Sequence, residues 1–278
     1  MTKAVGLHRN ADAARERTIS IRSKGQVMDI PRIFSISEST HRIHNPFTPE
    51  KYDTLGRVLR LEPGTSVLDL GSGSGEMLCT WARDFGITGT GIDMSKLFSE
   101  QAKRRAEELD VTGQVSFIHD DAAGYVAEEK VGVAACVGAT WIGGGVAGTI
   151  ELLSKSLASN GMILIGEPYW RKQPPSEEVI KGCGAGTLSD FLTLPELLGS
   201  FAELGYDIVE MVLADREGWD RYEAAKWLNM RRWLEENPDD DFAPEVRKQL
   251  SSAPARYASY TREYVGWGVF ALMDRKRH

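Results

Sequence analysis

The sequence of 278 residues predicts an α/β fold with a doubly wound, seven-stranded sheet. Two observations lead to this fold class. From residue 49 to residue 166, short apolar runs with strand character alternate with segments of helical spacing, which is typical of right-handed βαβ units around a parallel sheet. A run of alternating glycines also follows the first of these strands directly, at the position where doubly wound folds turn from strand to helix.

The first part of the chain predicts five strands joined by helices. A helix is expected over residues 49–60, because Tyr52, Leu55, Val58 and Leu59 recur at helical spacing and Pro63-Gly64 ends the pattern. Strands are expected at residues 67–70, 88–92, 115–118, 131–137 and 162–166, with helices at 76–85 and 95–109 between the first three. Because parallel strands end at one edge of a sheet, the loops that follow them should form a common site.

The last part of the chain predicts two more strands around a helical segment. A helix over residues 195–204 leads to a strand at 206–213, and a final strand is expected at 266–273. About fifty residues separate these two strands, which is far longer than a hairpin loop, and they are rich in Trp, Tyr and charge. We expect a helical insertion at about 214–262 that lies over the site as a lid.

Charge and composition exclude several classes of protein. The net charge is −7 and the pI is about 5.4, so no global basic field favours nucleic acid or an anionic membrane surface. The three cysteines are widely spaced and indicate neither a disulfide framework nor a metal site. Since the chain lacks an apolar run of about 20 residues and a signal-peptide pattern, we expect no membrane partner and a cytoplasmic location.

The charge is unevenly distributed along the chain. Residues 1–27 carry a net charge of +4 and no apolar period, so they are expected to be a flexible basic extension, and Met28 is a candidate for the true first residue. The remaining residues carry a net charge of −11. Residues 28–278 are therefore expected to form the folded domain, with the insertion inside it.

The glycine run reads Asp69-x-Gly71-x-Gly73-x-Gly75. Glycines in such a turn let the backbone approach a ligand closely and present the N–H groups of the helix start. The dinucleotide fingerprint needs a glycine where Glu76 stands, which disfavours an NAD-linked oxidoreductase without excluding it. Asp93, at the end of the second strand, is placed to accept hydrogen bonds from two ribose hydroxyls. Together these residues indicate a ligand that contains adenosine.

These motifs resemble those of the class I S-adenosylmethionine-dependent methyltransferases, and most of all the small-molecule branch related to ubiquinone-biosynthesis and cyclopropane-synthase methyltransferases. Residues 67–75 resemble the first motif of this family and residues 91–93 the second. Asp121-Ala122 and the Asn160-Gly161 turn extend the resemblance over roughly residues 45–170. Gly132 departs from the pattern, because the family often has Asp there. The resemblance implies a Rossmann-like sheet with an antiparallel last strand and S-adenosyl-L-methionine as the cofactor.

The resemblance also implies how the methyl donor is held. Asp69 is implied beneath its amino group, and Gly71, Gly73 and Gly75 along its methionine part. Asp93 is implied at the ribose, and Asp121 with Ala122 at the adenine. Met94 and Gly138 complete the expected donor-binding set.

The segment of residues 41–47 is one candidate for the acceptor side. Methyl transfer is an in-line displacement, so much of the catalysis comes from positioning the acceptor opposite the methyl group. A base is needed only for a protonated acceptor. His44 is a candidate catalytic residue, since imidazole titrates near neutral pH. The alternative for His44, and the favoured one for His41, is an exposed or helix-capping side chain.

Two further candidate segments follow the fourth and fifth strands. Thr140 and Trp141 are expected to offer a hydroxyl and a flat apolar wall, whereas Cys136 fits a buried core residue better. In the loop expected after residue 166, Glu167 is a candidate base or amine-orienting group. Tyr169 and Trp170 are expected to shape the acceptor pocket, with a solvated loop as the alternative.

The insertion contributes the remaining acceptor candidates. It holds Trp219, Tyr222, Trp227 and Trp233 with basic residues between them. Most of these rings are expected to form the insertion's own core, while Trp219 and Tyr222 are expected to close over the acceptor. Aromatic and basic residues in alternation are also typical of single-stranded nucleic acid binding, but the net charge of −11 argues against that.

The sequence therefore predicts methyl transfer from S-adenosylmethionine to a small-molecule acceptor. The alternatives are the NAD-linked oxidoreductase and a non-catalytic S-adenosylmethionine-binding regulator. A cavity at the acceptor side distinguishes the enzyme from the regulator, since a regulator has no need to keep that space open.

Overall fold

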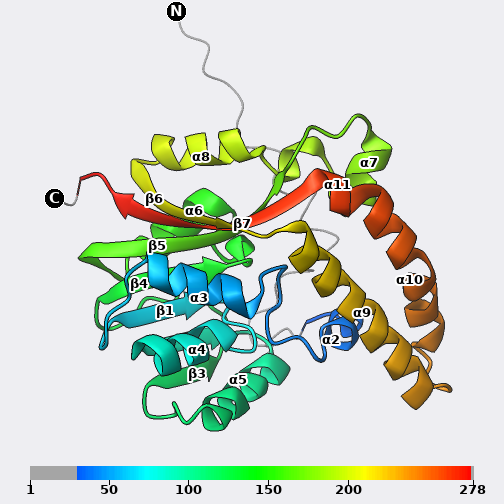
Figure 1. Cartoon of the computed structure of the whole chain (residues 1–278), viewed down its shortest axis with the longest axis horizontal. Coiled ribbons are helices and arrows are strands. Elements are labelled where there is room, and N and C mark those ends of the chain that lie inside the picture. The colour runs from blue at the N-terminus through cyan, green and yellow to red at the C-terminus, as the bar shows by residue number, and fades with distance from the viewer. Residues whose placement is uncertain (1–29, 277–278) are drawn as a thin grey trace, which may run out of the picture.

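Seven strands form one mixed sheet in the computed structural model, which describes residues 30–276 (Figure 1). The strand order is β3-β2-β1-β4-β5-β7-β6. Strands β1 to β5 pair in parallel, and β7 lies antiparallel between β5 and β6. This confirms the predicted doubly wound sheet with an antiparallel last strand. The strands are β1 (Ser66–Leu70), β2 (Thr88–Asp93), β3 (Val115–His119), β4 (Val131–Val137), β5 (Leu157–Trp170), β6 (Tyr206–Leu213) and β7 (Val265–Asp274).

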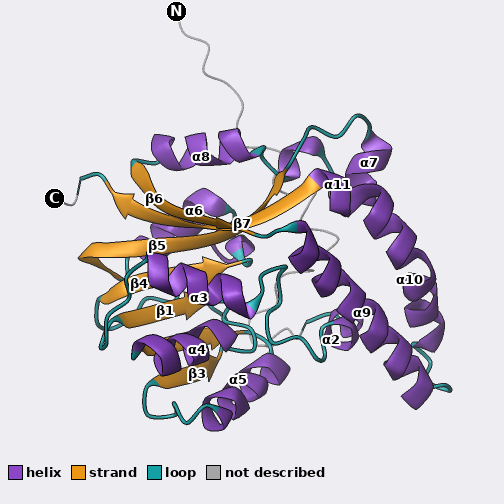
Figure 2. Cartoon of the chain, viewed as in Figure 1, coloured by secondary structure: helices purple, strands orange, loops and turns teal. Residues whose placement is uncertain are grey.

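Helices cover both faces of the sheet (Figure 2). One face packs against α3 (Pro49–Val58), α4 (Glu76–Phe85) and α5 (Lys96–Glu108), and the other against α6 (Val146–Ser154) and α8 (Leu194–Glu203). Successive residues of β1 enter opposite cores, with Val67 on the first face and Leu68 on the second. Burial on both faces explains why the strands read as continuous apolar runs.

Strand β5 differs from the sequence prediction. It runs from Leu157 to Trp170 instead of 162–166, so residues 167–170 are strand and not the expected loop. The reason lies in β7, whose residues 265–272 pair with β5 from Ile163 to Trp170 and continue the ladder beyond the end of β4. A partner a hundred residues later in the chain leaves no local signal in the sequence.

The residues between β6 and β7 are mainly helical. They form α9 (Arg216–Glu236), α10 (Ala243–Arg256), the π-helical turn η3 (Tyr257–Thr261) and α11 (Arg262–Tyr264), which extend beyond one end of the sheet (Figure 1). A separate small core, which includes Ile36, Met230, Leu234 and Val246, joins α9 and α10 to α2 (Arg32–Ser37). Their action as a lid stays a prediction. The extension expected at residues 1–27 lies outside the described residues.

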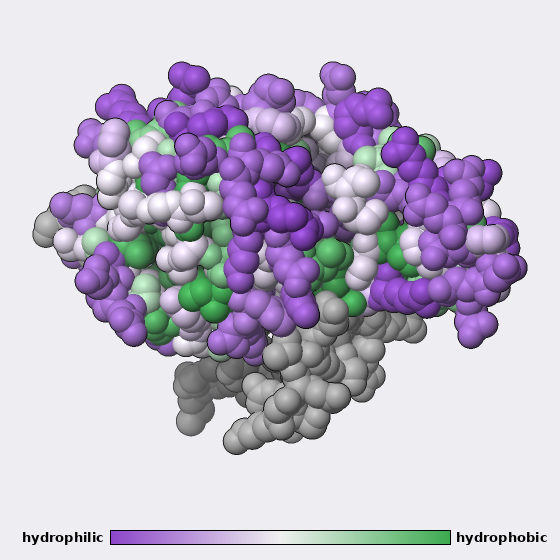
Figure 3. All heavy atoms as spheres, turned by 90° about the horizontal axis from the view of Figure 1, so that it is seen from below, coloured by the Kyte–Doolittle hydropathy of each residue, from purple (hydrophilic) through white to green (hydrophobic). Residues whose placement is uncertain are grey.

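The remaining elements are short. They are the 3-10 turns η1 (Thr140–Gly143) and η2 (Leu188–Asp190) and the helix α7 (Glu177–Gly182). Among residues 30–276, no helix is long and apolar enough to cross a membrane. On the face drawn in Figure 3, hydrophilic side chains predominate and apolar residues form small separate patches.

Candidate donor and acceptor site

The glycine loop passes between the end of β4 and a histidine ring. Gly71 and Gly73 have φ values of 79° and 53°, a region that L side chains rarely adopt. A Cβ on Gly71 would lie 2.7 Å from the Cβ of Ala139, and one on Gly73 would lie 2.8 Å from Cδ2 of His44. The close approach therefore requires glycine at both positions, as the motif predicts.

Asp69 carries a buried carboxyl group with an unpaired oxygen. The residue is 4 % exposed, and its Oδ1 has no hydrogen-bond partner among the described residues. Burial and the nearby charge of Asp93 raise the pKa of Asp69 to about 7. Buried carboxyl oxygens nearly always have a partner, so this one suits a cationic ligand group such as an ammonium.

Asp93 shapes the loop as well as facing the site. Its Oδ2 accepts a hydrogen bond from the Gly73 N–H and its Oδ1 one from the Ser95 N–H, both at 2.8 Å. Burial raises the pKa of Asp93 above its usual value, against the effect of these two hydrogen bonds. Each oxygen keeps a further lone pair that can accept from a ribose hydroxyl. The contact with Gly73 is a role that the sequence did not reveal.

The other expected donor residues lie at the same edge of the sheet. Asp121 is exposed and accepts the Ala123 N–H, while Ala122 is buried. The Met94 carbonyl contacts Nε2 of His119 at 3.0 Å, and the Gly138 N–H donates to the Gly166 carbonyl. The fold thus brings the whole set of residues expected to bind the donor to the carboxyl ends of β1 to β4.

Thr140 and Glu167 form a pair at the ends of β4 and β5. The Thr140 hydroxyl donates to Oε2 of Glu167 at 2.7 Å. Burial raises the pKa of Glu167 to about 7, and the hydrogen bond from Thr140 opposes this only in part. Ala139, the neighbour of Thr140, contacts the glycine loop, so the pair lies next to the donor-binding set.

Two aromatic residues predicted for the acceptor side, Tyr169 and Trp170, are core residues. Tyr169 and Trp170 are 5 % and 1 % exposed and belong to the cores on opposite faces of the sheet. The Trp170 indole N–H donates to the Leu188 carbonyl. These placements follow from the extension of β5, in which alternate residues face the two cores. Trp141, the neighbour of Thr140 in η1, is 47 % exposed and does not line the cavity described below.

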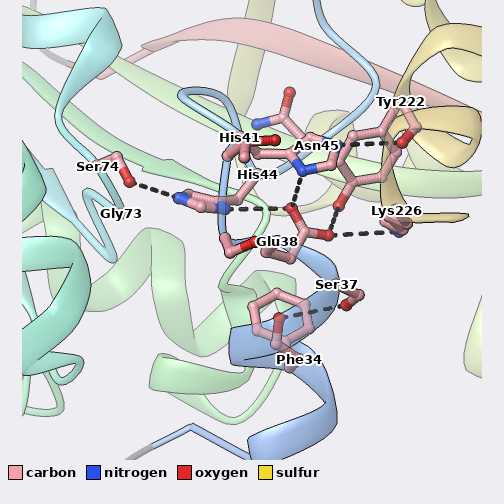
Figure 4. A network of polar contacts seen from close by, with 12 residues as sticks. Phe34, Ser37, Glu38, His41, His44, Asn45, Gly73, Ser74, Tyr222 and Lys226 are labelled. Atoms are coloured by element: carbon pink, nitrogen blue, oxygen red, sulfur yellow. Dashed lines mark hydrogen bonds and ion pairs between the residues drawn. The ribbon is translucent and has the colours of Figure 1, made fainter. Parts of the chain in front are cut away.

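His44 lies against the glycine loop, although it is far from it in sequence. Its Nε2 is 2.7 Å from the Ser74 hydroxyl and its Nδ1 is 3.2 Å from Oε2 of Glu38 (Figure 4). Its ring stacks on Phe98. Since both ring nitrogens are engaged, His44 is unsuited to the predicted role of a general base. Glu38 was missed by the sequence analysis, and the two histidines that closely follow it are the only local signal of this cluster.

A cavity of about 390 Å³ lies between α2, α9, α10 and the segment after β5. Both insertion residues predicted for the acceptor, Trp219 and Tyr222, line it. Its aromatic walls are Phe34, Phe191, Trp219, Tyr222, Trp227 and Tyr257, and its polar residues include Glu223, Lys226 and Arg256. The cavity is therefore lined by six aromatic rings together with smaller apolar residues and a few charged groups.

Comparison with known proteins decides the family. Residues 67–161 match the family described as "Methyltransferase domain". The uncharacterized protein YjhP of Escherichia coli K12 is 73 % identical over 248 residues, which cover 89 % of this chain and 100 % of that protein. A SAM-dependent methyltransferase from Geobacter sulfurreducens, crystallised with S-adenosyl-L-homocysteine, is 76 % identical with a TM-score of 0.88, covering 89 % and 99 % of the two chains. The chain belongs to the SAM-dependent methyltransferases.

More distant structures agree with this methyltransferase in fold. The cyclopropane synthase MmaA2 from Mycobacterium tuberculosis matches with a TM-score of 0.64 at 15 % identity, over 80 % of this chain and 82 % of that one. The predicted family is confirmed, and the NAD-linked oxidoreductase is not the family of this methyltransferase.

Within residues 30–276, no three His, Cys, Asp or Glu side chains are grouped to hold a metal ion.

Proposed function

We propose that this methyltransferase transfers the methyl group of S-adenosylmethionine to a small molecule bound in the cavity beside α9. The unpaired, buried Oδ1 of Asp69 next to the glycine loop carries the proposal, because it suits the ammonium group of a methionine moiety. The donor supplies a methyl group activated by a sulfonium cation. The S-adenosyl-L-homocysteine held by the Geobacter relative supports the same ligand class.

The chain's own residues would bind the donor along the edge of the sheet. Asp69 would accept from the amino group, and the glycine loop would lie along the methionine part. Asp93 would hold the ribose, and the segment of Asp121 and Ala122 would hold the adenine. Met94 and Gly138 would border this donor site.

The cavity supports a small-molecule acceptor. Its volume of about 390 Å³ lies in the range of about 300–1,000 Å³ that is usual for small-ligand sites. Aromatic walls exclude water and bind flat or apolar groups well. An open cavity also favours an enzyme over the non-catalytic regulator. An assay of labelled donor against metabolite pools tests this, and failure of every pool to accelerate donor turnover would favour the regulator.

Asp93→Ala should weaken the binding of S-adenosyl-L-homocysteine at least about tenfold. Each charge-assisted hydrogen bond to the ribose contributes about 1.5–3 kcal/mol, and the loop loses the Gly73 contact as well. Isothermal titration calorimetry measures the affinity. Asp207→Ala, which removes an exposed carboxylate paired with Arg275 at the far edge of the sheet, is the matched control and should bind normally. Equal affinities in the two variants would remove Asp93 from the ribose.

Glu167 does not line the cavity itself but precedes the lining residue Pro168, and it is proposed to accept a proton from, or to orient, an acceptor that reaches from the cavity toward the donor site. With an acceptor in hand and both substrates saturating, the rate should rise with pH through about 7 as the Glu167 carboxyl group ionises. Glu167→Gln should lower kcat by about 10²-fold or more and flatten this pH profile. Binding of S-adenosyl-L-homocysteine serves as the check that the variant is folded. An unchanged profile in Glu167→Gln would assign the proton transfer to another group.

A further inference from the structure

A buried carboxylate, Glu38, joins the glycine loop to the helical insertion (Figure 4). Its side chain is 0 % exposed and lies just after α2. On the insertion side, Oε1 accepts the Tyr222 hydroxyl at 2.8 Å and lies 3.4 Å from the Lys226 ammonium group. On the loop side, Oε2 lies 3.2 Å from Nδ1 of His44. One carboxylate thus contacts both the donor side and the cavity wall.

The charge of Glu38 is fixed by these partners. Burial alone would raise the pKa of Glu38. The hydrogen bond from His44 and the positive charges of Lys226 and the neighbouring histidines outweigh that effect, and the pKa falls to about 2. Glu38 is therefore an anion at neutral pH, and it can only accept hydrogen bonds.

The hydrogen bonds around His44 determine its protonation. Nδ1 faces the anionic Glu38, so it must carry a proton. The Ser74 hydroxyl donates its own proton to Oε1 of Gln101 at 2.6 Å, so it accepts from Nε2 of His44. Gln101 is oriented by its amide group, which donates to the Ser39 carbonyl. Both nitrogens of His44 are thus donors, and the ring is an imidazolium.

The second histidine of the cluster behaves differently. Nε2 of His41 contacts the Tyr222 carbonyl at 3.1 Å, so it is protonated, while Nδ1 lies 3.5 Å from Oε2 of Glu38 without forming a hydrogen bond. Burial lowers the pKa of His41 despite the nearby charge of Glu38. Burial therefore disfavours a positive charge on His41, whereas both ring nitrogens of His44 face hydrogen-bond acceptors.

The other charged groups of the cluster are balanced by a cationic His44. Lys226 pairs with Glu223 at 2.9 Å as well as facing Glu38. Two carboxylates and one ammonium group leave one negative charge, which the His44 imidazolium neutralises. Asp93 faces His44 from the end of β2, and the positive charge of His44 also favours the ionised form of Asp93.

We propose that Glu38 is a positioning residue that holds His44 as an imidazolium against the glycine loop and so couples donor binding to the conformation of α9. Two further hydrogen bonds tie α9 to the end of α2 and to the segment after it. Thr40 donates to Oδ1 of Asn229, and the Asn229 amide donates to the Ser37 carbonyl, both at 2.8 Å. The coupling rests on the proposed function in one respect, the binding of the donor at the glycine loop.

The protonation of His44 is testable in the ligand-free wild-type protein. In ¹⁵N NMR spectra of the histidine-labelled chain at pH 7, the signals missing from His44→Asn identify the residue. Both ring nitrogens should show protonated shifts in the wild type, and a neutral tautomer would overturn the proposal. In Glu38→Gln, His44 should become neutral. Glu76→Gln, which removes a buried carboxylate paired with Arg105, should leave the His44 signals unchanged.

The coupling is testable by hydrogen exchange of α9 with and without S-adenosyl-L-homocysteine. In the wild type, the ligand should slow exchange over residues 216–229, and Glu38→Gln should abolish this effect and weaken ligand binding at least about fivefold. Tyr222→Phe is a milder variant that removes only the hydrogen bond from Tyr222 to Glu38 and leaves the Lys226 and Asn229 contacts of α9 in place. It should keep the cationic His44 and the affinity within about threefold of wild type, and it should lose part of the protection.

The outcomes separate the coupling from the proposed function. Wild-type protection that persists in both variants would overturn the coupling. Failure of the wild type to bind S-adenosyl-L-homocysteine would instead overturn the proposed function. In that case the NMR measurement would still decide whether Glu38 holds His44 as a cation.

Discussion

Asp69→Asn is expected to make the ligand-free protein more stable at pH 8 while weakening donor binding by about 10²-fold. Asp69 has a raised pKa of about 7 in the folded chain, whereas the unfolded chain has the ordinary value of 3.8. Between these values the folded state binds more protons than the unfolded state. Wild-type stability should therefore fall as the pH rises from about 4 to about 7, and the neutral amide should avoid this loss.

The size of the stability gain in Asp69→Asn follows from the pKa shift of Asp69. One pKa unit corresponds to 1.36 kcal/mol, so a shift of about three units sets a gain of roughly 2–4 kcal/mol for Asp69→Asn at pH 8, and little gain at pH 4. Urea unfolding at the two pH values measures it. Asp207→Asn, at an exposed site, should change stability by no more than about 0.5 kcal/mol. A variant less stable than wild type at pH 8 would mean that the Asp69 carboxylate has a stabilising partner in the protein.

Ionisation of Asp69, which lowers the stability of the ligand-free protein, should strengthen donor binding. An ammonium group gains most from the ionised carboxylate, so binding of S-adenosyl-L-homocysteine near pH 6.5 should release a proton from Asp69. Calorimetry in buffers of different ionisation enthalpy detects this proton. The proton release should be absent in Asp69→Asn. The same residue would then lower the stability of the free protein and strengthen binding of its ligand, a trade-off that is common at functional sites.

The donor side was predictable because its signals are local. Asp69 and the glycines lie within one strand and turn, and Asp93 ends the next strand, so the parallel topology alone brings them together. The family resemblance added the roles of these residues. What the pattern did not contain is the direct contact between Asp93 and the Gly73 N–H, which depends on the path of the folded loop.

The acceptor side was predicted less well because it depends on distant parts of the chain. Tyr169 and Trp170 were expected at a pocket, but pairing with β7 places them in a strand between two cores. Glu38 was missed because its partner Tyr222 lies 184 residues away. His44 was found as a candidate, but the contacts on both of its ring nitrogens make it unsuited to act as a base.

Gly73→Ala should destabilise the protein by about 3–5 kcal/mol, well beyond the cost of its backbone conformation. A left-handed non-glycine residue costs about 1–2 kcal/mol. The new Cβ would also lie 2.8 Å from Cδ2 of His44, so the ring must move. Phe98 stacks on the ring at a centroid distance of 3.9 Å, and any shift weakens the contact with the buried Glu38. Leaving a buried charge without its partner costs about 3–5 kcal/mol. Because the contact between His44 and Glu38 is weakened and not removed, we expect part of this cost.

Gly64→Ala is the control that separates the clash with His44 from the backbone strain in Gly73→Ala. Gly64 also has a positive φ of 84°, but a Cβ there would meet nothing within 4 Å, so only the backbone strain of about 1–2 kcal/mol remains. Urea unfolding of both variants gives the difference, which we expect to be at least about 2 kcal/mol. Equal losses would mean that the His44 ring moves aside freely. A larger loss in Gly73→Ala, together with altered His44 ¹⁵N shifts, would tie the stability of the fold to the cation beside the donor loop.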